Sequence, residues 1–313
     1  MTLKLVSVLR EFTLEDKSTP DNANFVFDSY VNCPNHGLTR FARKIEDSQQ
    51  PWVDTTVVMN GSQVVGSGED PRAFLWRGSP CISAAFFNPG HGFINKIYIL
   101  SENRWLTLLP PDNLDAGKNW SPFVKDGDLY FVHGFSPFRV FKARMLHEND
   151  GFLLLDTVAE HEMPTRKADD NYTRLRGGSN ALQFGDLIVG VGHTNDRIGP
   201  KVHTNTYHRP FFFVYHPDKS LAYYECAFDF PERYRIVDPT SFYEKDGKLF
   251  LVTCETEQVW HHTPQQGRIC LYELERPGDE NEDSFGFGGR RIHRWPDGQP
   301  SKIRRLLGAW RRS

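Results

Sequence analysis

The sequence predicts an all-β fold, and more specifically a β-propeller. Aromatic residues make up 13% of the 313 residues, and the chain contains 25 glycines and 20 prolines. Short apolar runs bounded by Gly, Asn, Asp and Pro recur along the chain, whereas long stretches with helical periodicity are rare. This pattern is typical of proteins built from many short strands and tight turns.

A repeated hairpin gives the number of units. Three segments each contain a short strand, a turn with a glycine and a second strand that opens with leucine. They are SPFVKDGDLYFVHGF (121–135), SNALQFGDLIVGVGHT (179–194) and TSFYEKDGKLFLVTCET (240–256). Their turn glycines, Gly127, Gly185 and Gly247, suit hairpin turns because glycine tolerates positive φ. A spacing near 60 residues gives about five repeats over the chain. A four-stranded blade fills this length, which predicts a five-bladed β-propeller. A β-sandwich with repeated hairpins is the alternative.

The remaining segments extend this plan to both ends of the chain. FVFDSY (25–30) and GEDPRAFLW (68–76) are assigned to the earlier blades. Residues 1–277 are predicted to form the propeller, followed in 278–313 by an acidic linker and a basic tail. Within this tail, SKIRRLLGAWRRS (301–313) predicts an amphipathic helix. Its cap is Ser301 and its apolar stripe consists of Ile303, Leu306, Leu307 and Trp310.

Composition excludes several classes of protein. The net charge of −3 gives no overall basic field, so we expect no nucleic-acid partner. No run of about 18 apolar residues predicts a membrane span, and the first residues do not resemble a signal peptide. The five cysteines have no CxxC spacing, which favours reduced thiols in a cytoplasmic protein over disulfides or a zinc site.

Polar residues recur near the predicted hairpins and identify a candidate site. In a propeller the inner strands converge on one axis, so residues far apart in sequence can line one funnel. The recurring residues are Glu69, Asp70, Arg72, Lys118, Asn119, His133, Arg174, Arg176, His193, Glu255 and Glu257. This mixture of carboxylates, cations and histidines suits a sugar, and it contains no dense cluster that predicts a metal. Tyr207 and His208 are further candidate sugar contacts.

Five motifs in order resemble glycoside hydrolase family 130 and the related glycosyltransferase family 108. They are GEDPR, KNWSPF, LYFVH, RGGS with GVGHT, and PTSFYEKDGKLFLVTCETE, and they span roughly residues 65–260. The first family contains β-mannoside phosphorylases, and the second contains β-1,2-mannosyltransferases and phosphorylases. Both are five-bladed propellers that invert the configuration of the sugar. The resemblance therefore implies the same fold and related chemistry.

The resemblance also implies a role for Asp70. The aspartate of EDPR is the catalytic acid/base of the family. One carboxylate is sufficient when the nucleophile is phosphate, because no second base has to activate water. In the direction of synthesis Asp70 would deprotonate the acceptor hydroxyl, and Arg72 would orient Asp70 and keep it ionised. No cofactor is implied.

The implied phosphate or donor site shows one departure from the family. A cation before the glycines and a histidine about nineteen residues later correspond to Arg174 and His193, with Arg176 as the neighbouring alternative. Phosphorylases commonly have arginine where this chain has Gly134, directly after His133. Lys118 is the candidate replacement. The loss of one phosphate ligand favours a sugar-nucleotide donor or hydrolysis over simple phosphorolysis. The late carboxylate that binds sugar hydroxyls falls on Glu257, with Glu255 beside it.

Each assignment has a structural alternative. Asp70 could cap a turn, the two histidines could be ordinary strand residues, and RLRGGS could be a glycine bulge. Glu255 and Glu257 could form an acidic edge that prevents aggregation. The basic tail could make a peripheral contact with a membrane, although a helix docked on the propeller is favoured.

The sequence as a whole predicts an inverting glycosyltransferase or phosphorylase that acts on β-mannosidic or related linkages. Its expected partners are a GDP-mannose-like sugar nucleotide, or a sugar 1-phosphate with phosphate, and an oligosaccharide or glycan acceptor. The alternatives are an inverting β-glycoside hydrolase, which needs a second carboxylate such as Glu257 or Glu69, and a non-catalytic propeller that binds sugars or serves as an interaction scaffold.

Overall fold

The computed structural model consists of strands joined by turns and loops. It describes residues 2–14, 24–45, 55–90, 92–111, 117–144, 151–162, 167–168, 171–197, 206–217, 219–226, 228–258, 265–275 and 291–295. Among these residues the only helical element is the 3-10 turn η1 (Leu100–Glu102), which confirms the predicted all-β class. No helix within these ranges is long and apolar enough to cross a membrane. The predicted helix at 301–313 lies outside the described residues.

The strands pair in antiparallel groups of four. The first group contains β2 (Asn24–Cys33), β3 (Gly37–Ile45), β4 (Thr55–Met59) and β5 (Gln63–Ser67). The next contains β6 (Glu69–Trp76), β7 (Ser79–Asn88), β8 (Gly92–Ile99) and β9 (Arg104–Leu109). It is followed by β10 (Ser121–Lys125), β11 (Asp128–Phe135), β12 (Phe138–Arg144) and β13 (Phe152–His161).

The two later groups use both ends of the chain. One contains β15 (Asn171–Phe184), β16 (Leu187–Arg197), β17 (Thr206–His216) and β18 (Ser220–Glu225), with β14 (Lys167–Ala168) and β22 (Arg291–Trp295) added at its edges. The other contains β19 (Ile236–Lys245), β20 (Lys248–Thr256), β21 (Gln265–Glu275) and β1 (Thr2–Leu14). The N-terminal strand therefore completes the group formed by the last long strands of the chain.

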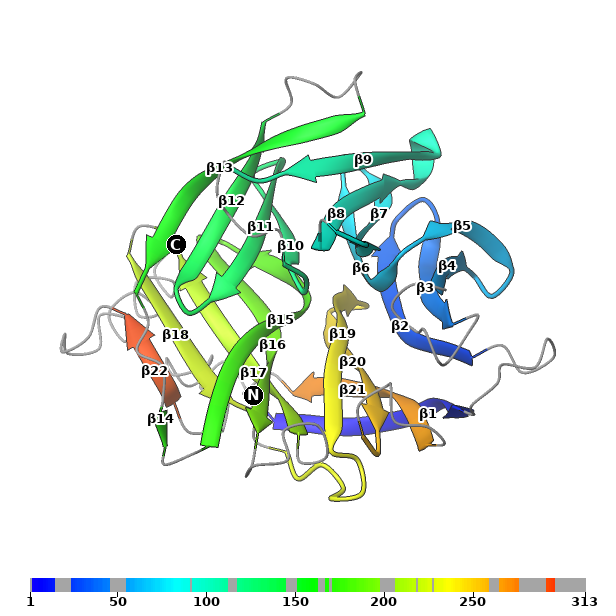
Figure 1. Ribbon diagram of the computed structural model, residues 1–313, viewed down its shortest axis with the longest axis vertical. Coiled ribbons are helices and arrows are strands. Elements are labelled where there is room, and N and C mark those ends of the chain that lie inside the picture. Colours follow the sequence, from blue (N-terminus) through cyan, green and yellow to red (C-terminus); the bar gives the residue numbers. More distant parts are fainter. Residues whose placement is uncertain are drawn as a thin grey trace.

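The groups lie around a common centre, as Figure 1 shows. The first strand of each group lies on the inner side, and each of these inner strands contacts the next: β2 with β6, β6 with β10, β10 with β15, β15 with β19, and β19 with β2. The arrangement is thus propeller-like, and it brings the starts of inner strands from distant parts of the sequence together.

The predicted hairpin turns are confirmed. Gly127, Gly185 and Gly247 lie in the turns that join β10 to β11, β15 to β16 and β19 to β20, and all three have positive φ (86°, 57° and 73°). In the turns at 126–127 and 246–247, the aspartate before the glycine also has positive φ. Two successive residues with positive φ are characteristic of the hairpin turn that matches strand twist.

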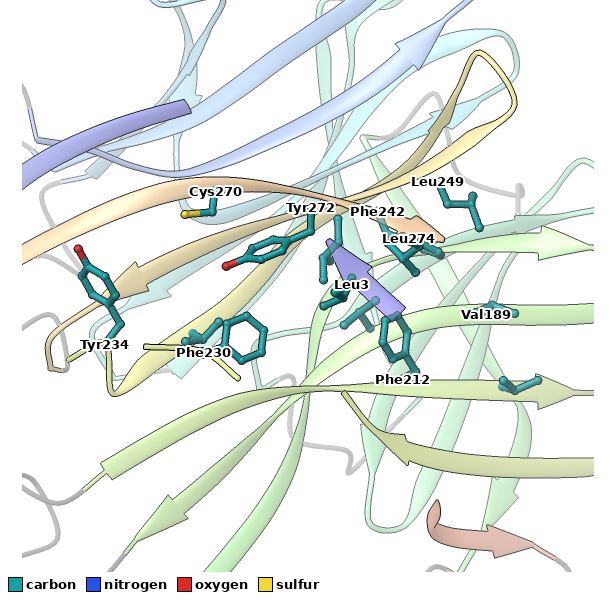
Figure 2. Packing of buried hydrophobic residues seen from close by; sticks show 14 residues of the cluster. Leu3, Val189, Phe212, Phe230, Tyr234, Phe242, Leu249, Cys270, Tyr272 and Leu274 are labelled. Atoms are coloured by element: carbon teal, nitrogen blue, oxygen red, sulfur yellow. The ribbon is translucent and has the colours of Figure 1, made fainter. Parts of the chain in front are cut away.

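The hydrophobic core is divided among the faces of neighbouring groups. Figure 2 shows one cluster, in which Val189 and Phe212 of one group pack near Phe242 and Leu249 of the next, with Leu3 of β1 among them. A further cluster joins β2 to β20 and β21, so packing also connects the last group to the first. Burial of apolar surface at each of these faces stabilises the ring of groups.

Two glycines permit close packing at the centre. A Cβ atom on Gly177 would lie 1.8 Å from the carbonyl oxygen of Asn119, and one on Gly178 would lie 2.3 Å from Cγ of Pro239. The pairing of β15 with β16 is irregular between Gly177 and Ala181, as expected of the glycine bulge that was the structural alternative for RLRGGS. The RGGS segment therefore allows three groups to approach one another.

Gly177→Ala is expected to destabilise the protein by about 3 kcal/mol, the upper end of the range typical of overpacking. The loss is large because the added methyl group would meet the backbone carbonyl oxygen of Asn119, which cannot move aside easily. Denaturant unfolding measures the loss. Gly127→Ala is the control, since its Cβ would meet nothing within 4 Å and only left-handed backbone strain of about 1–2 kcal/mol is added. Equal losses in the two variants would contradict the close-packing explanation.

Candidate active site

Asp70 lies at the start of an inner strand in an unusual backbone conformation. It is the second residue of β6, it is 8% exposed, and its φ is 52°. Phe27 of β2 and Asn119, just before β10, also have left-handed φ values of 56° and 69°. Such values are uncommon for non-glycine residues, especially bulky ones, and backbone strain of this kind clusters at functional sites.

Two cations hold the carboxylate of Asp70. Nη1 of Arg43 donates to Oδ1 over 2.7 Å, and Nζ of Lys118 lies 3.6 Å from Oδ2. The same two cations lie 3.3 and 3.1 Å from Oε2 of the buried Glu69. Burial alone would raise the pKa of Asp70, but Lys118, Arg43 and Arg72 together lower it below its usual range. Asp70 is therefore ionised at neutral pH.

Arg72 connects several strand groups at the centre. Its guanidinium donates to the carbonyl oxygens of Asp70 and Gly178 and, over 3.0 Å, to Oδ1 of Asn119. It also lies over the ring of Phe27, with 5.3 Å from Cζ to the centroid. Arg72 thus holds the backbone carbonyl of Asp70 and connects it to residues of neighbouring groups, while its predicted role in orienting the Asp70 carboxylate stays a prediction. Its predicted contact with a substrate stays a prediction.

A second group of side chains contains His193, His208 and Asp238. Nδ1 of His208 and Oδ1 of Asp238 are 2.7 Å apart, and Nδ1 of His193 lies 3.8 Å from the same oxygen. The imidazole rings stack with centroids 4.7 Å apart. Burial lowers the pKa of His193 to about 3, although Asp238 opposes the shift, so His193 is neutral at physiological pH.

Electrostatic interactions link the two groups. Burial alone would raise the pKa of Asp238, but His208, which also hydrogen-bonds to it, and Arg72 lower it well below its usual range. Arg72 is also among the cations that act on Asp70, and the negative charge of Asp238 raises the pKa of Asp70. The acid and the histidine pair therefore belong to one buried, charged region.

Strand register explains the position of the predicted donor site. Arg176 in β15 lies directly opposite His193 in β16, and Arg174 lies opposite Asn195. Arg176 lowers the pKa of His193 electrostatically, which places its charge near the histidine pair. The side chain of Arg174 lies outside the described residues. Of the two arginines considered from the sequence, Arg176 is thus the one that the structure relates to His193.

The two late carboxylates have partners of their own. Glu255 is completely buried and accepts hydrogen bonds from Tyr272 (2.6 Å) and Arg268 (2.8 Å). Glu257 pairs with Arg233 over 2.7 Å near the surface. Among the described residues, no hydrogen bond or ion pair joins either carboxylate to Asp70. Their predicted contacts with sugar hydroxyls stay predictions, as does the role of Glu257 as a second carboxylate.

Two aromatic candidates lie among other rings and cations. His133 in β11 packs against Trp120 and Phe141, with ring centroids 5.2 and 4.8 Å apart. The Tyr207 ring lies near the guanidiniums of Arg209 and Arg235. Trp120 follows Asn119 directly in sequence, so His133 packs beside the segment that contacts Arg72.

Sequence analysis missed Arg43 and Asp238. Arg43 lies in β3 within RFARK, where no turn or motif distinguishes it. Asp238 had a usable signal, because it precedes Pro239 just as Asp70 precedes Pro71, and both pairs lie at the start of an inner strand. The recurrence of Asp-Pro at equivalent positions of the repeat would have identified Asp238.

Comparison with known proteins supports the fold. The structure is similar to a mannose phosphorylase from Leishmania mexicana solved in complex with phosphate ion, with 13% sequence identity, a TM-score of 0.51, and coverage of 91% of this chain and 92% of that one. It is also similar to a GDP-Man-dependent mannosyltransferase from the same organism, with 13% identity, a TM-score of 0.50, and coverage of 92% and 94%.

A β-xylosidase is a third structural match, with 11% identity, a TM-score of 0.50, and coverage of 82% of this chain and 94% of that one. No protein-family model matches the sequence, and no curated protein matches it significantly. The resemblance to mannose phosphorylases and mannosyltransferases is thus confirmed at the level of the fold, which is shared with carbohydrate-active enzymes.

Proposed function

We propose that the protein is a five-bladed β-propeller enzyme that transfers a mannosyl or related sugar with inversion. The five groups of four strands and the closed circle of inner strands support this blade count and disfavour a β-sandwich. The fold shared with a mannose phosphorylase and a mannosyltransferase supports the sugar class. Its partners would be a GDP-mannose-like donor or a sugar 1-phosphate, and a glycan acceptor.

The observation that carries the proposal is the buried Asp70 carboxylate, held by Arg43 and Lys118 beside the group that contains His193. A carboxylate, together with the positive charges of Lys118 near Asp70 and of Arg176 near His193, provides the two elements that sugar transfer to or from phosphate requires. One moves a proton, and the other stabilises an anionic phosphate.

The ionised form of Asp70 is the form that accepts a proton from the acceptor hydroxyl in the direction of synthesis. The acceptor hydroxyl oxygen would attack the anomeric carbon while its proton passes to Asp70. The bond between the anomeric carbon and the phosphate oxygen would break with its electron pair, releasing phosphate or a nucleoside diphosphate. Arg176, His193, Lys118 and Arg174 are the proposed contacts for this anion. Phosphorolysis is the same reaction in reverse and requires protonated Asp70.

Hydrolysis is the second candidate, because Glu69 and Asp238 supply further carboxylates near Asp70. In an inverting hydrolase a second carboxylate activates water. A non-catalytic sugar-binding propeller is the third candidate. The cytoplasmic location and a membrane contact by the basic tail stay predictions.

Thermal unfolding with single ligands tests the proposal. GDP-mannose, mannose 1-phosphate, phosphate and mannobiose are compared, because a ligand at 100 times its Kd adds about 2.7 kcal/mol of stability. We expect stabilisation by a phosphate-containing ligand, and loss of this stabilisation in Arg176→Gln. Stabilisation by mannobiose alone would favour the hydrolase or the binding protein, and no shift with any ligand would contradict the proposal.

Arg43→Gln is expected to shift the pH profile of synthesis. The change removes a positive charge 2.7 Å from Asp70, so the carboxylate is less stabilised and its pKa rises. Because synthesis needs ionised Asp70, the acidic limb of the kcat/KM profile should move to higher pH. An unchanged acidic limb would show that Asp70 is not the titrating base.

A further inference from the structure

The strongest feature outside the proposed acid–base chemistry is the meeting of His193, His208 and Asp238. They come from three strands, β16, β17 and β19. His193 lies opposite Pro210 and Asn195 lies opposite His208, so the two imidazoles are diagonal neighbours on one face. His208 also pairs with Ile236 of β19, and Asp238 follows two residues later on the same face.

The distances suit a shared ion. One ligand atom from each residue lies within 4.8 Å of the others, and Oδ1 of Asp238 is 2.7 and 3.8 Å from Nδ1 of His208 and of His193. Zn²⁺ binds imidazole nitrogen and carboxylate oxygen at about 2.0–2.2 Å, so two ligands of one ion lie roughly 3–4 Å apart. Nδ1 of His193, at 3.8 Å from Oδ1 of Asp238, lies within this range. Nδ1 of His208 is already at hydrogen-bond distance from the same oxygen, so the atom that His208 offers to an ion is Nε2, which has no hydrogen-bond partner among the described residues.

An independent observation also points to a ligand. Nδ1 of His193 and Nε2 of His208 are buried and lack a hydrogen-bond partner among the described residues. His193 is only 4% exposed. Leaving a buried polar atom unsatisfied costs free energy, and a bound metal ion removes this cost by accepting a nitrogen lone pair.

We propose that His193, His208 and Asp238 form a binding site for a divalent transition-metal ion, and that Zn²⁺ fits the ligand set best. Sequence reasoning predicted no metal because Asp238 was not recognised and the two histidines are 15 residues apart in the chain. Three protein ligands leave a coordination position open. We propose that this position takes a phosphate oxygen of the donor, a step that rests on the proposed function. Metal binding itself does not rest on the proposed function.

The test uses the full-length protein, stripped with a chelator and titrated with Co²⁺ as a spectroscopic probe. We expect one Co²⁺ per chain, with visible d–d absorption that Zn²⁺ abolishes by competition. His208→Ala and Asp238→Asn should lose this absorption. His216→Ala, at another buried histidine of β17, should retain it. The lack of thiolate-to-cobalt absorption in the ultraviolet separates this site from the five free cysteines.

Wild-type protein that binds no stoichiometric Co²⁺ or Zn²⁺ would overturn the inference, and this result does not depend on whether a variant folds. Retention of the wild-type spectrum in Asp238→Asn and His208→Ala would overturn it as well. The measurement needs no sugar donor, so an enzyme without transferase activity but with intact Co²⁺ binding would contradict only the proposed function.

Discussion

Asp70→Asn is expected to reduce turnover with every productive donor by a factor of about 10² to 10⁴, the usual contribution of a positioned acid or base. Asparagine tolerates the left-handed conformation of this position (φ 52°), so the variant removes the proton acceptor with little backbone strain. The measurement is kcat/KM with GDP-mannose and with mannose 1-phosphate, alongside donor binding by calorimetry, which we expect to persist.

The matched control is Asp126→Asn. Asp126 also has left-handed φ (53°), but its side chain is 67% exposed in the hairpin turn before β11. Turnover should be unchanged in this variant. If Asp70→Asn were as active as Asp126→Asn with every donor, Asp70 would have only a structural role.

Arg72→Gln is expected to cause the largest loss of stability, about 3–5 kcal/mol, the usual cost of breaking a buried charged interaction. Arg72 is 3% exposed, and its donors satisfy acceptors on Asp70, Gly178 and Asn119. Removing the guanidinium leaves these acceptors short of donors and takes a positive charge away from Asp70. Urea unfolding measures the loss.

Arg77→Gln provides the comparison, because Arg77 is an exposed turn residue whose guanidinium lies 4.4 Å from the ring centroid of Trp76. A contact of this type contributes about 0.5–1 kcal/mol. If Arg72→Gln lost no more stability in urea than Arg77→Gln, Arg72 would not hold the strand groups together.

Local patterns predicted the fold well for a physical reason. The hairpin turns at Gly127, Gly185 and Gly247 need a residue with positive φ, which few residues other than glycine adopt easily. A glycine between two short strands therefore marks each turn in the sequence. The spacing of these turns then reports the size of the repeating unit. The closing contact between β1 and β21 could not be predicted in this way, because it joins residues 2–14 to residues 265–275 through pairing that leaves no local signal.

The candidate site was predictable only in part. Motif order identified Asp70 and His193, which the structure places in one charged region, and Lys118, which lies beside Asp70. Arg43 could not be found, because its importance comes from a contact across 27 positions of sequence rather than from any pattern around it. The partners of Glu255 could not be predicted either, because Arg268 and Tyr272 reach it across strand pairing that leaves no pattern around Glu255.

Proton NMR of the reaction with GDP-mannose or mannose 1-phosphate and a mannose acceptor tests the central claim most directly. We predict a new β-linked anomeric signal from the α-linked donor, with stoichiometric release of GDP or phosphate, which Asp70→Asn forms about 10² to 10⁴ times more slowly. Retention of the α configuration, or formation of the product by Asp70→Asn at the wild-type rate, would contradict the account.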